Sequence, residues 1–148
     1  MELLESVKAL LVEGKRGGIL PREVSPLGLA YIGDAIFEIF VRTTVLARAN
    51  APVNKLHKQA RDIVNAKAQA EMYRHIAPHL TEEEFAIFKR GRNAKSFTTP
   101  KNMDLMDYRH ATGLEALFGF LYLDGKMERA FELFKIGLEK RYTTDIEK

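Results

Sequence analysis

The chain has 148 residues, of which 46% are hydrophobic and 29% are charged, a composition too apolar for a disordered protein and too charged for an integral membrane protein. The absence of cysteine excludes disulfides, thiolate chemistry and cysteine-based zinc sites, while the net charge of +3 allows an anionic partner without requiring one. We expect one domain over residues 1–148 of a cytoplasmic protein that does not bind a membrane, because we find neither a signal peptide nor an apolar run near the ~18 residues of a spanning helix.

Hydrophobic residues recur at helical spacing along almost the whole chain, which predicts an all-α fold. The first helix is expected over about residues 3–13, with Gly14 as its stop. The second should begin at Ser25 and run to about Ala49, because serine at the N-cap followed by Pro26 is a strong helix start.

Four further helices are predicted, and they cover about 54–75, 81–91, 104–124 and 127–142. Asn54 is the expected cap of the third helix, and Thr81 with Glu84 forms a capping box at the start of the fourth. Gly125 should stop the fifth helix, and the chain is expected to fray after Tyr142. A polar loop over residues 91–103 joins the fourth and fifth helices.

The two most apolar predicted helices each contain an acidic residue in an unusual position, Asp34 in the second and Glu115 in the fifth. Burying an ionised carboxylate costs several kcal/mol unless a partner compensates. Three explanations stay open: an ion pair with a residue such as Arg42 or Arg109, protonation with a raised pKa, or shared coordination of a cation. Oxygen-only ligands would favour Mg²⁺, with Mn²⁺ as a possible substitute.

Small residues lie within a turn of both acids and would leave room for water, a metal or a ligand. Glu38, four residues after Asp34, is expected to form an ion pair at the rim. The glycines at positions 28, 33, 113 and 119 are expected to permit close helix packing. The four histidines have no HExxH spacing and no His-Asp pair, and the chain has no GxSxG, P-loop or GxGxxG motif.

Positive charge is concentrated in residues 88–101, which contain five basic residues and no acid, a local charge of +5. Residues 54–75 contain five basic and two acidic residues, a local charge of +3, for which a solvated face is an equally good explanation. Basic side chains among hydroxyl and amide donors suit phosphate contacts, and the polar loop over residues 91–103 contains a single aromatic residue, Phe97, which favours duplex over single-stranded RNA. The candidate RNA-binding residues are Lys89, Arg90, Arg92, Asn93, Lys95, Ser96, Thr98, Lys101, Lys58 and Lys67.

Three segments together resemble the catalytic domain of the ribonuclease III family over about residues 25–139: YIGDAIFE at 31–38, KLHKQARDIVNAKAQA at 55–70 and HATGLEALFGFLYLD at 110–124. The short chain and the runs KRGRNAKS and TTPKN are similar to the Mini-ribonuclease III subgroup, which lacks a separate RNA-binding domain. Asp34 and Glu115 match the family's two central catalytic acids. Two further acids of the larger enzymes are replaced here by Ala30 and Thr112, as in Mini-type enzymes.

This resemblance implies a helical homodimer that uses Mg²⁺, held by Asp34 and Glu115, to cut double-stranded RNA into 5′-phosphate and 3′-hydroxyl ends. It also implies maturation of the bacterial 23S ribosomal RNA precursor, and a ribosomal protein of the large subunit is a candidate partner. The alternative is a non-catalytic helical protein that binds double-stranded RNA or the ribosome. A helical protein-interaction domain with structural ion pairs explains neither the two acids nor the basic segment.

Overall fold

The computed structural model describes residues 5–7, 9–10, 20–95 and 103–147, with side chains described as far as Glu139. The elements are η1 (Pro21–Glu23), α2 (Pro26–Arg48), α3 (Val53–Ile63), α4 (Ala66–Ile76), η2 (Ala77–His79), α5 (Glu82–Asn93), α6 (Leu105–Leu123) and α7 (Met127–Glu147). Residues 5–7 and 9–10 are helical as well, and the rest of the first predicted helix, with Gly14, lies outside the described residues. The predicted all-α class is confirmed, since the described ranges contain no strand.

The third predicted helix is wrong in two respects. It begins at Val53 rather than at Asn54, with Pro52 in the cap position, and it breaks into α3 and α4 at Val64 and Asn65. Asn65 is extended, with φ −150° and ψ 159°, and its side chain accepts a hydrogen bond from the amide of Ala68 at 2.9 Å. An asparagine side chain that caps a new helix competes with continuation of the old one.

The other helix ends follow the sequence signals more closely. The Ser25 side chain caps α2, Thr81 and Glu84 form the predicted capping box of α5, and Asp104 caps α6. Gly125 ends α6 with a φ of 77°, a left-handed conformation that glycine adopts at little cost. Two ends were placed too early: α5 continues to Asn93, and α7 continues to Glu147 instead of fraying after Tyr142.

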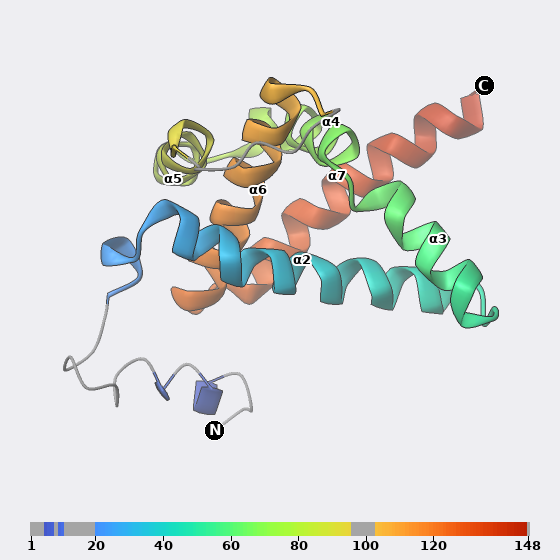
Figure 1. Cartoon of the computed structure of the whole chain (residues 1–148), viewed down its shortest axis with the longest axis horizontal. Coiled ribbons are helices and arrows are strands. Elements are labelled where there is room, and N and C mark those ends of the chain that lie inside the picture. The colour runs from blue at the N-terminus through green and yellow to red at the C-terminus, as the bar shows by residue number, and fades with distance from the viewer. Residues whose placement is uncertain (1–4, 8, 11–19, 96–102, 148) are drawn as a thin grey trace.

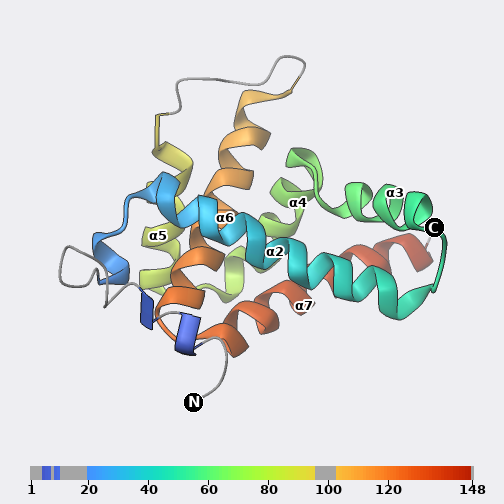
Figure 2. The ribbon, with the colours of Figure 1, turned by 60° about the horizontal axis from the view of Figure 1, so that its bottom comes forward.

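Helix α6 is the centre of the fold, and α2, α4, α5 and α7 all pack against it (Figure 1). Helix α2 crosses α6, with α5 near one end of α2 and α3 at the other end, as both views show (Figure 2). The rings of Phe37 and Phe40 on α2, Phe118 on α6 and Phe134 on α7 pack together at centroid distances of 5.4–6.2 Å. This burial explains why both α2 and α6 are apolar on most of their surface.

Glycines set the crossing of α2 and α6. A Cβ atom on Gly33 would lie 1.7 Å from the carbonyl oxygen of Glu115, and one on Gly119 would lie 2.0 Å from the carbonyl oxygen of Leu29. The two backbones are therefore in direct contact, as predicted for positions 33 and 119. Gly113 packs in the same way, against the Phe88 ring of α5, whereas Gly28 faces the side chains of its own helix start.

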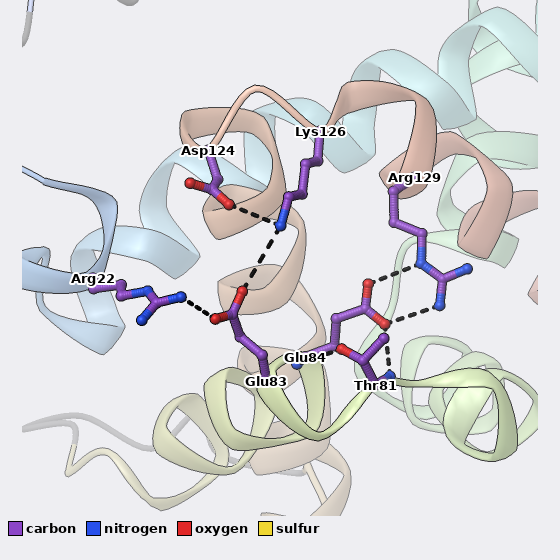
Figure 3. A network of polar contacts seen from close by, with 7 residues as sticks. All are labelled: Arg22, Thr81, Glu83, Glu84, Asp124, Lys126 and Arg129. Carbon is purple, nitrogen blue, oxygen red and sulfur yellow. Dashed lines mark hydrogen bonds and ion pairs between the residues drawn. The ribbon is translucent and has the colours of Figure 1, made fainter.

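An ion pair between the buried Glu84 and the half-buried Arg129 joins the starts of α5 and α7 (Figure 3). The carboxylate of Glu84 accepts two hydrogen bonds from Arg129, at 2.8 and 2.9 Å, and Arg129 also donates to the carbonyl oxygen of His79. Burial raises the pKa of Glu84, but the hydrogen bonds from Arg129 and Thr81 outweigh it and leave the pKa lowered. Glu84, predicted only as a capping residue, therefore also fixes α7 against α5.

Candidate active site

Asp34 and Glu115 lie side by side where α2 crosses α6. Both line an open pocket of about 510 Å³, in which Asp34 is exposed and Glu115 is half-buried. The two acids lie close together because Gly33, the residue before Asp34, packs directly on the backbone of Glu115. The other residues of the pocket wall are Leu27, Ala30, Tyr31, Ile32, Ala35, Tyr108 and Thr112.

The surroundings of Glu115 shift the pKa of its carboxyl group. The pKa of Glu115 is raised to about 8, first by burial and then by the neighbouring Asp34, which repels the ionised form and accepts a hydrogen bond from the protonated form. More distant repulsion from Glu38 acts in the same direction, whereas the amide of Gln69 lowers the pKa. Without a cation, Glu115 is therefore protonated at neutral pH.

The ion-pair explanation for these acids is wrong within the described part of the chain. No described Lys, Arg or His nitrogen lies within 4.0 Å of either carboxylate. Arg42 instead contacts Glu38, with the expected separation of four residues and an N–O distance of 3.0 Å. Two adjacent acids without a basic partner favour a cation-binding role, while the described residues contain no group of three or more potential metal ligands among His, Cys, Asp and Glu.

This arrangement predicts an unusual dependence of stability on pH. The folded chain holds a proton on Glu115 between the ordinary pKa of 4.5 and about 8, whereas the unfolded chain releases it. The free energy of unfolding of the metal-free protein should therefore fall as pH rises through this window. Glu115→Gln should remove this effect and stabilise the metal-free protein by about 2 kcal/mol at pH 8, with almost no gain at pH 5.

Urea denaturation of both proteins at pH 5 and pH 8, in the presence of a chelator, measures the difference. Glu128, an exposed acid on α7, provides the control variant Glu128→Gln, whose effect should be the same at the two pH values. An equal effect of Glu115→Gln at both pH values would contradict the raised pKa.

Several pocket residues were missed by sequence reasoning. Tyr31 and Tyr108 form part of the wall, and the Tyr31 side chain is 83% exposed. No pattern in the sequence assigned either tyrosine to a site. Ala30 and Thr112, the two positions where larger relatives carry acids, both line the pocket. The hydroxyl of Thr112 donates to the carbonyl oxygen of Tyr108 at 3.0 Å. The two positions at which this chain differs from the pattern of the larger enzymes therefore both line this pocket.

The basic residues of the predicted RNA-binding set divide into three places. Lys89, Arg90, Arg92 and Asn93 lie on the last two turns of α5, rather than partly in a loop, and Lys95 follows directly. All except the half-buried Arg92 are exposed. A Cβ atom on Gly91, in the middle of this group, would lie 3.2 Å from the carbonyl oxygen of Thr112, so this end of α5 packs against a residue of the pocket wall.

The rest of the set is more scattered. Lys67 is exposed in the first turn of α4, and Lys58 is exposed on α3, which lies at the opposite end of α2 from α5 (Figures 1 and 2). One copy of the chain therefore does not bring Lys58 together with the end of α5. Ser96, Thr98 and Lys101 lie outside the described residues.

Comparison with known proteins identifies this architecture. The sequence profile described as Ribonuclease III domain matches residues 27–126. The chain belongs to the ribonuclease III domain family. The expected resemblance is thus confirmed, and so is the expected class of enzyme, an endoribonuclease. Within the described residues, no helix has the length and hydrophobicity needed to cross a lipid bilayer.

Relatives cover most of this ribonuclease III chain. A Mini-ribonuclease 3 from a Thermoanaerobacter species is 45% identical over 139 residues, which cover 94% of each chain. The Mini-ribonuclease 3 of Brevibacillus brevis is 50% identical over 113 residues, which cover 76% of this chain and 84% of that protein. A crystal structure of a protein from Fusobacterium nucleatum is similar with a TM-score of 0.72 and 37% identity, covering 81% of this chain and 96% of that one.

Proposed function

We propose that this ribonuclease III chain cuts double-stranded RNA with the help of a divalent metal ion held by Asp34 and Glu115. The principal support is that these two carboxylates lie together in a pocket that is open to solvent. Among the described residues, no basic side chain forms an ion pair with either of them. The basic end of α5 packs against Thr112 of that pocket and would supply positive charge that attracts a phosphate backbone.

The residues present fit Mg²⁺ or Mn²⁺. A cation between the two carboxylates would replace their repulsion with attraction, and it would favour ionised Glu115 over the protonated form. Because no third His, Cys, Asp or Glu of the described residues joins the two carboxylates, water and phosphate oxygens would fill the other positions. Magnesium ions are commonly held by only one or two carboxylates with several retained waters, so this small ligand set suits Mg²⁺.

The chemistry that follows from this site is hydrolysis of a phosphodiester. A bound Mg²⁺ ion supplies Lewis acidity, which activates water and stabilises the leaving 3′ oxygen. Asp34 and Glu115 would hold the ion in the pocket, and the basic residues of α5 would contact the phosphates of the RNA strand. The products would carry 5′-phosphate and 3′-hydroxyl ends.

A homodimer completes the proposal, since cutting both strands of a duplex requires two such sites. Helix α2 exposes several large hydrophobic side chains that an isolated chain would leave in water: Leu27, Tyr31, Ile39 and Leu46. A second copy packed against α2 would bury this surface beside the site. Paired sites on opposite strands would leave short 3′ overhangs.

The basic end of α5 should contribute to the salt dependence of RNA binding. Replacing Lys89, Arg90 and Lys95 with alanine should weaken duplex binding and reduce the slope of log K against log salt by about 2 to 3, because each phosphate contact releases about one counterion. Arg92 is left intact because its guanidinium lies 5.9 Å from the centre of the Phe88 ring, so its loss would also disturb packing.

Fluorescence anisotropy of a labelled RNA duplex at several salt concentrations, in the absence of divalent ions, measures this slope. Lys135→Ala removes an exposed charge from α7, which lies apart from the end of α5, and should leave the slope unchanged. A triple variant with the parental slope would mean that the RNA does not contact α5.

We further propose that the substrate is the bacterial 23S ribosomal RNA precursor, cut in the cytoplasm and presented by a ribosomal protein of the large subunit. The similarity to proteins named Mini-ribonuclease 3 supports an RNA-processing role of this kind. Mapping the ends produced from precursor RNA, alone and in pre-ribosomal particles, tests both the substrate and the need for a protein partner. Duplex binding without cleavage would favour the non-catalytic alternative, which the replacement of two acids by Ala30 and Thr112 would explain.

A further inference from the structure

A buried amide next to the two acids is not explained by packing. Gln69, on α4, is 4% exposed, and its Nε2 atom has no hydrogen-bond partner among the described residues. Buried polar atoms are almost always paired, so an unpaired donor needs a specific explanation. Leucine or methionine would fill the same space without a polar group.

The position of Gln69 follows from the break between α3 and α4. Asn65 starts α4 afresh, and the buried alanines at positions 66, 68 and 70 on either side of Gln69 let the helix pack closely on its neighbours. Helix α4 packs on α6, which contains Glu115. Helix α4, which carries neither of the two acids, thus brings Gln69 to the active site.

The free amide faces Glu115. Its effect is to lower the pKa of that carboxyl group, as a nearby N–H donor does, although the two groups lack the geometry of a full hydrogen bond in the metal-free protein. When Glu115 is ionised beside a cation, the unpaired N–H group of Gln69 is a neighbouring donor available to its carboxylate. Outer groups that donate to a metal-binding carboxylate fix its orientation and strengthen metal binding.

We propose that Gln69 is a positioning residue of the metal site: its side-chain N–H group donates to the Glu115 carboxylate and holds it toward the ion shared with Asp34. The proposal rests on the metal-dependent function argued above, because it assigns Gln69 a role only when a cation is bound. The amide contacts neither the ion nor the RNA in this role. Its loss should therefore weaken metal binding without weakening RNA binding.

The test measures metal binding directly. Mn²⁺ and Mg²⁺ are titrated calorimetrically into the full chain without RNA, for the parental protein, for Gln69→Met and for Met72→Leu. Gln69→Met retains the volume and removes the donor, so the dissociation constant should rise about 10-fold while the melting temperature of the metal-free protein stays the same or rises. Met72→Leu is the control, since Met72 is equally buried on α4 but contacts Gly137 on α7 instead of the pocket.

Kinetics supply a second readout. For Gln69→Met, kcat at low Mg²⁺ should fall, KM for a duplex RNA should stay unchanged, and high Mg²⁺ should restore most of kcat. If that variant does not fold, Gln69→Asn replaces it, because the shorter amide keeps a polar group but falls short of Glu115. The same weakening of metal binding is then expected.

The outcomes separate the two proposals. Parental metal affinity in a folded Gln69 variant would overturn the positioning role and leave the proposed function intact. A parental protein that binds neither ion would overturn the metal site and the positioning role together. Metal binding weakened equally by Met72→Leu would reduce Gln69 to a packing residue and overturn the proposal.

Discussion

Asp34→Asn and Glu115→Gln should each reduce cleavage of a long RNA duplex in the presence of Mg²⁺ at least 1,000-fold, on the order expected when charge stabilisation at the reacting phosphate is lost. Each variant removes one of the two carboxylates that line the pocket and would share the ion. The amides keep nearly the same shape, and neither replaced residue belongs to the basic end of α5. Duplex binding should therefore remain within about threefold of the parental value.

Single-turnover cleavage, with binding measured separately by anisotropy, distinguishes the two effects. Glu128→Gln on α7 is a suitable control, because it exchanges an exposed carboxylate for an amide on an element that does not line the pocket. Parental cleavage by both active-site variants would show that the site lies elsewhere. Loss of binding together with cleavage would mean that these acids support the RNA surface instead of the reaction.

Gly33→Ala should strongly destabilise the protein. The added Cβ atom would lie 1.7 Å from the carbonyl oxygen of Glu115 and 2.8 Å from the amide nitrogen of Gly119, and both contacts are backbone atoms that no rotamer change can move. The helices must separate, and overpacking of this kind costs about 3 kcal/mol or more. Because separation also moves Asp34 away from Glu115, any protein that still folds should cleave poorly.

Urea denaturation at low temperature, followed by circular dichroism, measures the stability change. Gly28→Ala provides the matched control on the same helix. Its Cβ atom would meet only side-chain atoms, at 3.0 Å from Ser25 and 3.1 Å from Val24, and alanine favours the helix by about 1 kcal/mol. We expect its stability to stay within about 1 kcal/mol of the parental value. Parental stability of Gly33→Ala would contradict the close crossing of α2 and α6.

Local signals in the chain were sufficient for most of the fold. Helical periodicity predicted the class, and cap residues such as Ser25 and Thr81 marked helix starts because their side chains satisfy free amides within three residues. The break at Asn65 was missed, because an asparagine within a periodic pattern is equally compatible with an uninterrupted helix. Arg129 was missed as the partner of Glu84, since 45 residues separate them and no local pattern connects them.

The sequence by itself determined the helical class, the candidate acids and the concentration of positive charge near residue 90, because each depends on residue type and short spacing. Only the tertiary structure decided how these features meet. It brings Asp34 to Glu115 through the glycine contact of α2 with α6, and it places no basic side chain of the described residues in an ion pair with either acid. It separates Lys58 from the basic end of α5. It also brings the amide of Gln69 beside Glu115. The pKa of a carboxyl group depends on its burial and on its neighbours in space, which lie on helices far apart in the chain.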